Sequence, residues 1–294
     1  VWTHVAGVYD AAAAEIRLYV DGVLQGTAHQ PAAWNGSGGF VVGRAKFNGQ
    51  PVDFFRGAID EVRVWDRVLT SDEIAALANQ AVLRAHYPLN EGTGTTTRDT
   101  VTGREARLQG TASWEVGQYT SVKFVGVSGE HGGFVAAPRP DFRTDKSYTV
   151  MAWVRHDQLD QYARTAVSIG DPKYSPFLLQ YRPEQRQWGM LIMSAPDCEC
   201  GWQALSSTPA VAGQWVHLAA VYDGVKREVR LYVNGQLSGT ASGGTVWNND
   251  GELLIGRAQF YGTEADPWKG AVDEVRVFSG TLAADQIRRY TVRR

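Results

Sequence analysis

The feature that most constrains this chain is an internal repeat. A constant offset carries Trp2 onto Trp215, His4 onto His217 and the segments around them onto each other without a gap. The matched segments are VWTHVAGVYD (1–10) with QWVHLAAVYD (214–223), EIRLYVDGVLQGTA (15–28) with EVRLYVNGQLSGTA (228–241), and GAIDEVRVW (57–65) with GAVDEVRVF (270–278). A repeat of this length indicates that both copies adopt one fold.

The two copies differ in what precedes them. Residues 83–214 come before the second copy and carry strand patterns of their own, whereas the first copy stands at the beginning of the chain. We therefore expect residues 1–80 to be the C-terminal part of a first domain whose N-terminal part is missing, and residues 81–294 to be a complete domain. Half a sandwich leaves an apolar sheet face uncovered, so we expect another chain or the missing half to complete it. The simplest interpretation is a fragment of a longer protein with tandem domains.

Short strand patterns dominate both copies. They are rich in Val, Leu, Tyr and Trp, are bounded by Gly, Pro, Asp and Asn, and predict an all-β sandwich. The clearest lie at 148–155, 165–170, 176–182, 187–194, 215–223 and 228–233.

Two dipeptides between such strands predict hairpin tips. Asp21-Gly22 and Asn234-Gly235 tolerate the positive φ angles of a two-residue type I′ turn. Each of them should therefore reverse the chain between paired antiparallel strands.

Helical patterns are short and stand at the ends of the two copies. In TSDEIAALAN, Thr70 and Glu73 have the spacing of a capping box, in which each residue bonds the backbone amide of the other. Residues 282–290 should form a second short helix.

The charge pattern excludes two classes of partner. The formal net charge is −2, and acidic and basic residues are interspersed, so we expect neither nucleic-acid binding nor attraction to an anionic membrane. No apolar run approaches the ~18 residues of a spanning helix. We therefore expect no membrane insertion.

The two cysteines stand close together in PDCECGW. A bridge between Cys198 and Cys200 would close a very tight loop, and the alternative is a pair of free thiols. We expect no catalytic role for either form.

The order of these motifs carries a family resemblance. AHYPLNEGTG (85–94), RDTVTGREARLQG (98–110), SVKFVG (121–126), LLIGRA (253–258), the strands quoted above and a terminal helix follow one another. In this order the chain resembles the laminin G-like (LamG-like) group of concanavalin A-like lectin/glucanase jelly rolls, found in secreted multidomain bacterial proteins, particularly of actinobacteria. The resemblance implies two antiparallel sheets packed face to face, a structural calcium in many members, and a ligand surface on one face or at its loop rim.

The resemblance also implies a calcium site in the complete domain. Asp99 and Asp273 match positions that help to hold the ion between the first loop and a late strand, and the loop containing Gly103 presents backbone carbonyls. The alternative is that the aspartate caps a turn through its own backbone. Asp60, the first-copy counterpart of Asp273, lacks a partner loop on this chain, so we expect no ion there.

The sequence offers little for catalysis. Glycoside hydrolases on this fold place carboxylates on alternate residues of one strand, whereas DEVRV predicts that neighbouring Asp273 and Glu274 point to opposite faces. A G-x-S-x-G elbow is absent. His4 and His217 recur together with the residues around them, so we expect both to have a structural and not a catalytic role. We expect that the chain is not an enzyme.

Glycan binding needs an exposed aromatic ring and planar polar groups. Trp2 and Trp215 recur in both copies, so we assign them to the core or to loop anchoring. Residues specific to the second copy are better candidates, although aromatic residues of a sandwich are more often core. The candidates are Tyr174, Tyr181, Trp202, Tyr261, Asp266 and Trp268.

Two functional hypotheses remain open. One is a noncatalytic recognition module of a larger secreted protein that binds a glycan or a glycosylated surface. The other is a structural or protein–protein interaction domain in a tandem extracellular array, with a neighbouring domain as its ligand. A glucanase-type glycoside hydrolase is a distant third.

Overall fold

The computed structural model describes residues 2–293 apart from 33–35, 37 and 128–131. The chain divides into two compact units, Val1–Ala78 and Asn79–Arg294. Each unit is described by itself below.

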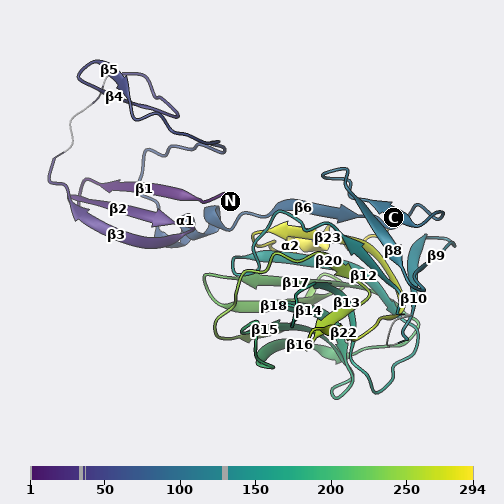
Figure 1. The fold of residues 1–294 in the computed structure, drawn as a ribbon. Helices are drawn as coiled ribbons and strands as arrows, with labels where there is room; N and C mark the ends of the chain where they lie inside the picture. Colours follow the sequence, from purple (N-terminus) through teal and green to yellow (C-terminus); the bar gives the residue numbers. More distant parts are fainter. Residues whose placement is uncertain (1, 33–35, 37, 128–131, 294) are drawn as a thin grey trace. The chain divides into compact units, whose positions relative to one another are not determined.

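The second unit is a sandwich of two antiparallel sheets (Figure 1). The first sheet has the strand order β19-β18-β17-β12-β23-β10-β9, and β6 pairs with β23 beside it. Its strands are β19 (Gln236–Ser242), β18 (Glu228–Val233), β17 (Trp215–Asp223), β12 (Tyr148–His156), β23 (Lys269–Ser279), β10 (Ser121–Val125), β9 (Ser113–Glu115) and β6 (Val82–Tyr87).

The second sheet has the order β16-β15-β14-β13-β20-β11-β8-β7. These strands are β16 (Gly201–Pro209), β15 (Gln187–Met193), β14 (Phe177–Arg182), β13 (Arg164–Ile169), β20 (Leu253–Ile255), β11 (Phe134–Ala137), β8 (Glu105–Gln109) and β7 (Thr96–Arg98). A small hairpin, β21 (Ala258–Phe260) with β22 (Thr263–Ala265), follows β20. This architecture confirms the predicted all-β jelly-roll sandwich.

One large apolar core lies between the two sheets. It joins Val150, Val272 and Val277 of the first sheet to Val167 and Leu179 of the second, all essentially without exposure to solvent. A smaller cluster covers the outer face of the first sheet, where Ile287 and Leu282 pack on Met151 and Phe278. Ile287 belongs to α2 (Ala284–Arg288), which lies within the predicted terminal helix.

The described residues of the first unit form a three-stranded sheet, a small hairpin and one helix. Its elements are β1 (Val5–Asp10), β2 (Glu15–Val20), β3 (Val23–His29), β4 (Ala45–Phe47), β5 (Gln50–Val52) and α1 (Ser71–Ala78). The predicted capping box of α1 is confirmed, because Glu73 N–H donates to Thr70 Oγ1 at 3.2 Å and Thr70 N–H donates to Glu73 Oε2 at 2.8 Å. Both predicted hairpin tips have positive φ at each of their two residues, which confirms the type I′ turns.

The two copies repeat their unusual backbone angles as well as their sequence. Non-glycine residues with positive φ occur at equivalent positions in both copies, which shows that the repeat extends to local geometry. The pairs are Ala14 with Arg227, Asp21 with Asn234, Asn48 with Tyr261, Asp53 with Asp266, and Glu61 with Glu274.

One repeated segment has a different structure in each copy. GAVDEVRVF lies within β23, where β12, β10 and β6 pair with it, and Val277 is wholly buried. The matching residues 57–65 form no strand, and the equivalent Val64 is 72% exposed. The sequence is nearly the same, so the neighbouring strands are what make this segment a strand. The prediction that 1–80 is the latter part of a sandwich is consistent with this difference and stays a prediction.

A matched pair of substitutions tests the contrast. Val277→Ala should lower the free energy of unfolding by about 2 kcal/mol, because it removes buried methyl groups and leaves a cavity. Val64→Ala should change it by less than ~0.5 kcal/mol, as expected for an exposed site. Urea denaturation of the full chain, followed by tryptophan fluorescence, measures both. An equal loss from the two substitutions would show that residue 64 is buried in solution.

Candidate ligand-binding site

Tyr261 stands at the tip of the β21–β22 hairpin. Tyr261 and Gly262 have φ angles of 53° and 73°, which is the backbone of a two-residue type I′ turn. The side chain is 64% exposed. The first copy has Asn48 at this position with a φ of 47°, so the turn is common to both copies and the aromatic ring is specific to the second.

The exposed ring of Tyr261 is held by three neighbours. Its centroid lies 5.2 Å from the ring of Tyr174 and 5.2 Å from the ring of Phe260, both in edge-on geometry. Its hydroxyl donates to Glu199 Oε2 at 2.5 Å. This hydrogen bond raises the pKa of Tyr261, with a further contribution from Tyr174. An exposed aromatic face in a fixed orientation is the arrangement that stacks on a flat apolar ligand surface.

The loop that carries Glu199 is closed on itself. A disulfide joins Cys198 to Cys200, which settles the choice that the sequence leaves open between a bridge and two thiols. Ser194 N–H donates to Cys200 O at 2.8 Å, and the Thr245 hydroxyl donates to Ser194 O at 3.3 Å. These ties preform the loop beside Tyr261.

Trp202 lies two residues beyond this loop, on β16, and is half-buried. Its ring packs so closely on Gly243 that a Cβ at position 243 would stand 2.0 Å from the ring. It also packs against Tyr222, with ring centroids 6.2 Å apart. Among the residues that the structure describes, no acceptor bonds Trp202 Nε1. The ring is therefore held against Gly243 and Tyr222, and the residue is only partly covered from solvent.

Asp266 directly follows β22 and has a strained backbone conformation, with a φ of 51°. Its backbone carbonyl accepts a hydrogen bond from Thr165 N–H at 2.8 Å, and the Thr165 hydroxyl donates to its carboxylate at 3.5 Å. Burial raises the pKa of Asp266, although the charge of Arg182 opposes the shift. This carboxylate is half-buried and faces β13.

Three of the predicted ligand residues lie in the interior. Tyr181 and Trp268 belong to the main core at 1% and 0% exposure, and both rings pack against His156, with centroids 5.0 and 5.2 Å from it. Tyr174 is also buried and supports the ring of Tyr261. Such side chains present no surface to a ligand, so we reassign them to packing. The strand pattern does not reveal this, because it cannot tell which rings point into the core between the two sheets.

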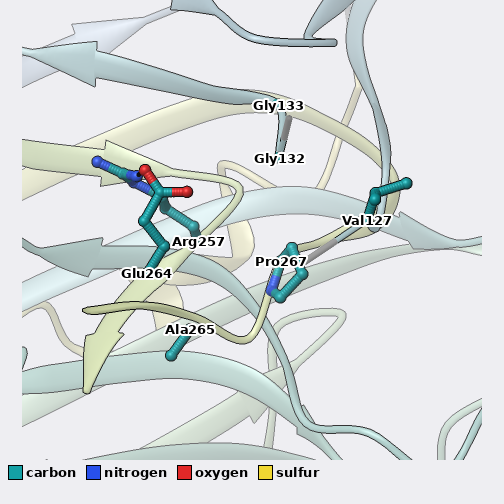
Figure 2. A pocket seen from close by; sticks show the side chains of 7 residues that line it. All are labelled: Val127, Gly132, Gly133, Arg257, Glu264, Ala265 and Pro267. Carbon is teal, nitrogen blue, oxygen red and sulfur yellow. Dashed lines mark ion pairs between the residues drawn. The ribbon is translucent and has the colours of Figure 1, made fainter. Parts of the chain in front are cut away.

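A small pocket of about 220 Å³, part of it open to solvent, lies beside the same hairpin (Figure 2). Arg257 and Glu264 face each other on one side of it and form an ion pair, while Val127 and Pro267 line the other. The Arg257 guanidinium lies 3.4 Å from the ring centroid of Phe134. Burial lowers the pKa of Arg257 to about 10. We interpret this pocket as a gap left where the β21–β22 hairpin packs on the neighbouring segments, and not as a ligand site.

Asp99, the first predicted calcium ligand, is hydrogen-bonded by its own loop and by β6. Its carboxylate accepts hydrogen bonds from the N–H groups of His86 at 2.8 Å and Val101 at 3.0 Å. The Thr102 hydroxyl donates to it at 2.5 Å. Gly103 N–H donates to Asp99 O at 2.8 Å, and Gly103 itself has a φ of 74°. This is the turn-capping arrangement that the sequence allows as the alternative.

Asp273, the second predicted calcium ligand, faces a cation of the protein itself. Arg293 Nε donates to Asp273 Oδ2 at 2.8 Å, and the two side chains are 9% and 2% exposed. Burial raises the pKa of Asp273 to about 7, although Arg293 opposes the shift. Within the described part of the chain, no three His, Cys, Asp or Glu side chains gather as a metal site. The carboxylates of Asp99 and Asp273 as arranged do not fit a calcium ion. The calcium site that the family resemblance implies stays a prediction.

Asp273 and Glu274 lie on the same face of the first sheet, so the predicted alternation is wrong here. Val272 and Val275 both belong to the core, and Ala152 faces two residues of β23 because the register shifts between Met151 and Trp153. Glu274 has the positive φ of such a β-bulge, 53°.

The bulge creates a cluster that the sequence did not reveal. His86 Nε2 lies 2.8 Å from Glu274 Oε2, and the Thr100 hydroxyl lies 2.9 Å from His86 Nδ1. A hydroxyl, an imidazole and a carboxylate in series have the connectivity of a nucleophilic triad. Glu274 also pairs with Arg276, however, and the Thr100 hydroxyl also reaches the carbonyl of His86. We interpret the cluster as a tie between β6, β23 and the Asp99 loop.

The comparisons with known proteins concern this fold. The family profile Laminin_G_3, described as the concanavalin A-like lectin/glucanases superfamily, matches residues 1–75 and 128–288. No curated protein matches the sequence. No described helix is both long enough and apolar enough to cross a membrane.

Several solved structures share the fold at low identity. Domain 4 of AbnA, an extracellular GH43 arabinanase of Geobacillus stearothermophilus in complex with arabinotriose, is 20% identical with a TM-score of 0.56, covering 72% of this chain and 99% of that one. Trypanosoma rangeli sialidase with sialic acid is 20% identical with a TM-score of 0.53, covering 71% of this chain and 32% of the sialidase. The binding domain of Paraclostridial Mosquitocidal Protein 1 is 11% identical with a TM-score of 0.54, covering 71% and 51%.

The buried His156 predicts a pH dependence of stability. Burial lowers its pKa to about 4 from the ordinary 6.5, so protonation between these values favours the unfolded chain. The free energy of unfolding should therefore fall as the pH drops from about 6.5 to 4. His156→Phe should remove about 3 kcal/mol of that fall. Urea denaturation at several pH values measures it, and a variant with the same pH profile as the wild type would contradict the assignment.

The arrangement of Asp99 and Asp273 predicts indifference to calcium. Addition of millimolar calcium to chelator-treated protein should leave the melting temperature unchanged within ~1 °C, whereas an ion bound at a hundred times its Kd would add about 2.7 kcal/mol. Differential scanning calorimetry decides between the two. A clear rise that Asp99→Asn abolishes would restore the calcium site.

Proposed function

The chain belongs to the concanavalin A-like lectin/glucanases superfamily, and from this premise we propose that its second unit is a noncatalytic recognition module. Its ligand is a glycan or a glycosylated surface. We place the module in a larger secreted protein, for which the Cys198–Cys200 disulfide is the supporting observation.

The observation that carries the proposal is the exposed ring of Tyr261. A pyranose or furanose offers an apolar C–H face that stacks on an aromatic ring, and the ring must be both accessible and fixed. Tyr261 meets both conditions, since it is 64% exposed and packs edge-on against Tyr174 and Phe260. Glu199, bonded to the Tyr261 hydroxyl, adds carboxylate oxygens that accept hydrogen bonds from sugar hydroxyls.

The surrounding loops support a preformed site. The disulfide between Cys198 and Cys200 and the bond from Ser194 N–H to Cys200 O hold the Glu199 loop before any ligand arrives. Half-buried Trp202 lies at the start of the strand that follows. A site ordered in advance loses less conformational entropy on binding, which favours affinity for flexible ligands such as oligosaccharides.

The similar structures are consistent with this class of ligand. The AbnA domain is seen with arabinotriose, and nearly its whole length aligns with this chain. At 20% identity the likeness concerns the fold, so the choice of sugar rests on the residues of this chain. Arabinotriose and sialic acid are therefore the first probes rather than the expected answer.

The carboxylate environments favour a noncatalytic role. Asp273 is 1% exposed and paired with Arg293, so a substrate does not reach it. Glu274 already pairs with His86 and Arg276. Hydrolysis by the two-carboxylate route needs one acid and one base or nucleophile facing the same sugar bond. A glucanase is therefore the weakest of the three hypotheses.

A second candidate function is protein–protein interaction within a tandem array. The first unit exposes apolar residues at the positions whose second-copy equivalents are core, with Val64 72% exposed. Exposed apolar surface of this kind is typical of a contact with another chain or with a missing part of the same domain. This candidate concerns the first unit and is independent of Tyr261.

Tyr261→Asn tests the glycan proposal with little strain, because the first copy carries Asn48 in the same turn conformation. The full chain should bind members of a glycan array, with arabinotriose and sialic acid included. The substitution should weaken binding of the selected glycan at least tenfold, about 1.4 kcal/mol, in calorimetric titration. The residual affinity measures what Glu199 and the loops contribute without the ring.

Tyr162→Asn is the matched control, since Tyr162 is 58% exposed and belongs to the β12–β13 connection, not to the hairpin that carries Tyr261. It should leave glycan affinity unchanged. An array without binding, from protein shown to be folded, would transfer the assignment to the protein-interaction candidate. Equal losses from both tyrosines would mean that the glycan contacts another surface.

A further inference from the structure

Arg293 lies on the outer face of the first sheet, where aromatic rings and a carboxylate surround its guanidinium. Its guanidinium lies 3.5 Å from the ring centroid of Trp215 and 4.8 Å from that of Tyr119. Its Nε donates to the buried carboxylate of Asp273 at 2.8 Å. A carboxylate at one edge and aromatic rings against the plane are the features that recognise a guanidinium rather than an ammonium group.

The walls of this site come from separate segments of the fold. Trp215 begins β17, Asp273 is turned outward by the β-bulge of β23, and Tyr119 lies in the connection between β9 and β10. Trp215 was expected to anchor the core or a loop, and it instead forms the floor of the site. Trp215 and Asp273 belong to strands of the first sheet and Tyr119 to the β9–β10 loop, so the walls of the site come from segments other than the one that carries Arg293.

The site has a single buried negative charge to satisfy. Arg155 also approaches Trp215, at 5.3 Å from the ring centroid, but its guanidinium pairs with Glu115 at 2.9 Å and Asp157 at 2.9 Å. Asp273 therefore relies on Arg293 for its counter-charge. A cation of matching shape is required at this place whenever the carboxylate is ionised.

The fit of Arg293 is incomplete. Its Nη2 is buried and has no hydrogen-bond acceptor among the residues that the structure describes. The segment that carries it follows α2 without regular structure, and the preceding Val292 is 69% exposed. The residue next to Arg293 is thus exposed, and one donor of the guanidinium has no acceptor among the described residues.

We propose that Trp215, Tyr119 and Asp273 form a recognition site for an arginine side chain, filled by the tethered Arg293 and open to exchange with an arginine of a partner protein. The partner is defined by its chemistry, a guanidinium on an accessible segment that also brings an acceptor for Nη2. This site is separate from the Tyr261 region, and it stands whether or not that region binds glycan.

The test removes the tethered ligand from the full chain. Arg293→Ala and Arg293→Gln should bind N-acetyl-arginine methylamide saturably, seen as a change in tryptophan fluorescence and in calorimetric titration. The wild type should bind at least tenfold more weakly, because Arg293 competes for the site. N-acetyl-lysine methylamide should also bind at least tenfold more weakly than the arginine probe.

Arg289→Ala is the matched control, because Arg289 is in the same terminal segment with a side chain 76% exposed. It should behave as the wild type does. If either Arg293 variant is unfolded, the arginine probe must restore folding. Folded variants without saturable binding, equal binding of the lysine probe, or unfolded variants that the probe does not restore would each overturn the proposal.

Discussion

The second unit depends on the burial of one strand. β23 pairs with β12 along one edge and with β10 and β6 along the other, and its valines fill the core between the sheets. Each of these contacts is long-range in sequence, so the strand forms only when distant segments have already come together. Residues 57–65 show the opposite case, since nearly the same letters form no strand without such neighbours. Strand propensity is thus a statement about fitting a pleated, half-buried surface.

Local chemistry is what the sequence predicts well in this chain. The Asp-Gly and Asn-Gly turns, the reciprocal bonds of Thr70 and Glu73, and most strands follow from spacing and residue type, because each rests on interactions within a few residues. The positions of Tyr181 and Trp268 could not be predicted in the same way. Whether such a ring faces solvent or the core depends on which face of its sheet packs on the other sheet. The sequence did not predict the bulge at Glu274 either, since its partner strand β12 lies far away in the sequence.

A comparison of the two copies distinguishes the backbone features that they share from the side chains that differ between them. Positions with positive φ recur in pairs, so these backbone angles, including those at Glu61 and Glu274, belong to the common frame. Side chains at some of those positions differ, and Tyr261 replaces Asn48 on an unchanged hairpin tip. An exposed ring can be exchanged there without altering the backbone, because the turn tolerates both residues. Arg293 illustrates the complementary case, in which repeated residues, Trp215 and Asp273, acquire a role from a side chain outside the repeat.

The near-identity of 57–65 and 270–278 has a consequence for biosynthesis. The ribosome delivers the earlier segment first, and β6, β10 and β12 follow it before the later segment is made. During that interval the nascent chain already holds a segment of almost the same sequence from the other copy. Misassembly between similar neighbouring domains is a characteristic failure of repeat proteins. The few differences between the copies, including Phe278 where the first has Trp65, are all that distinguishes the later segment from the earlier one during synthesis.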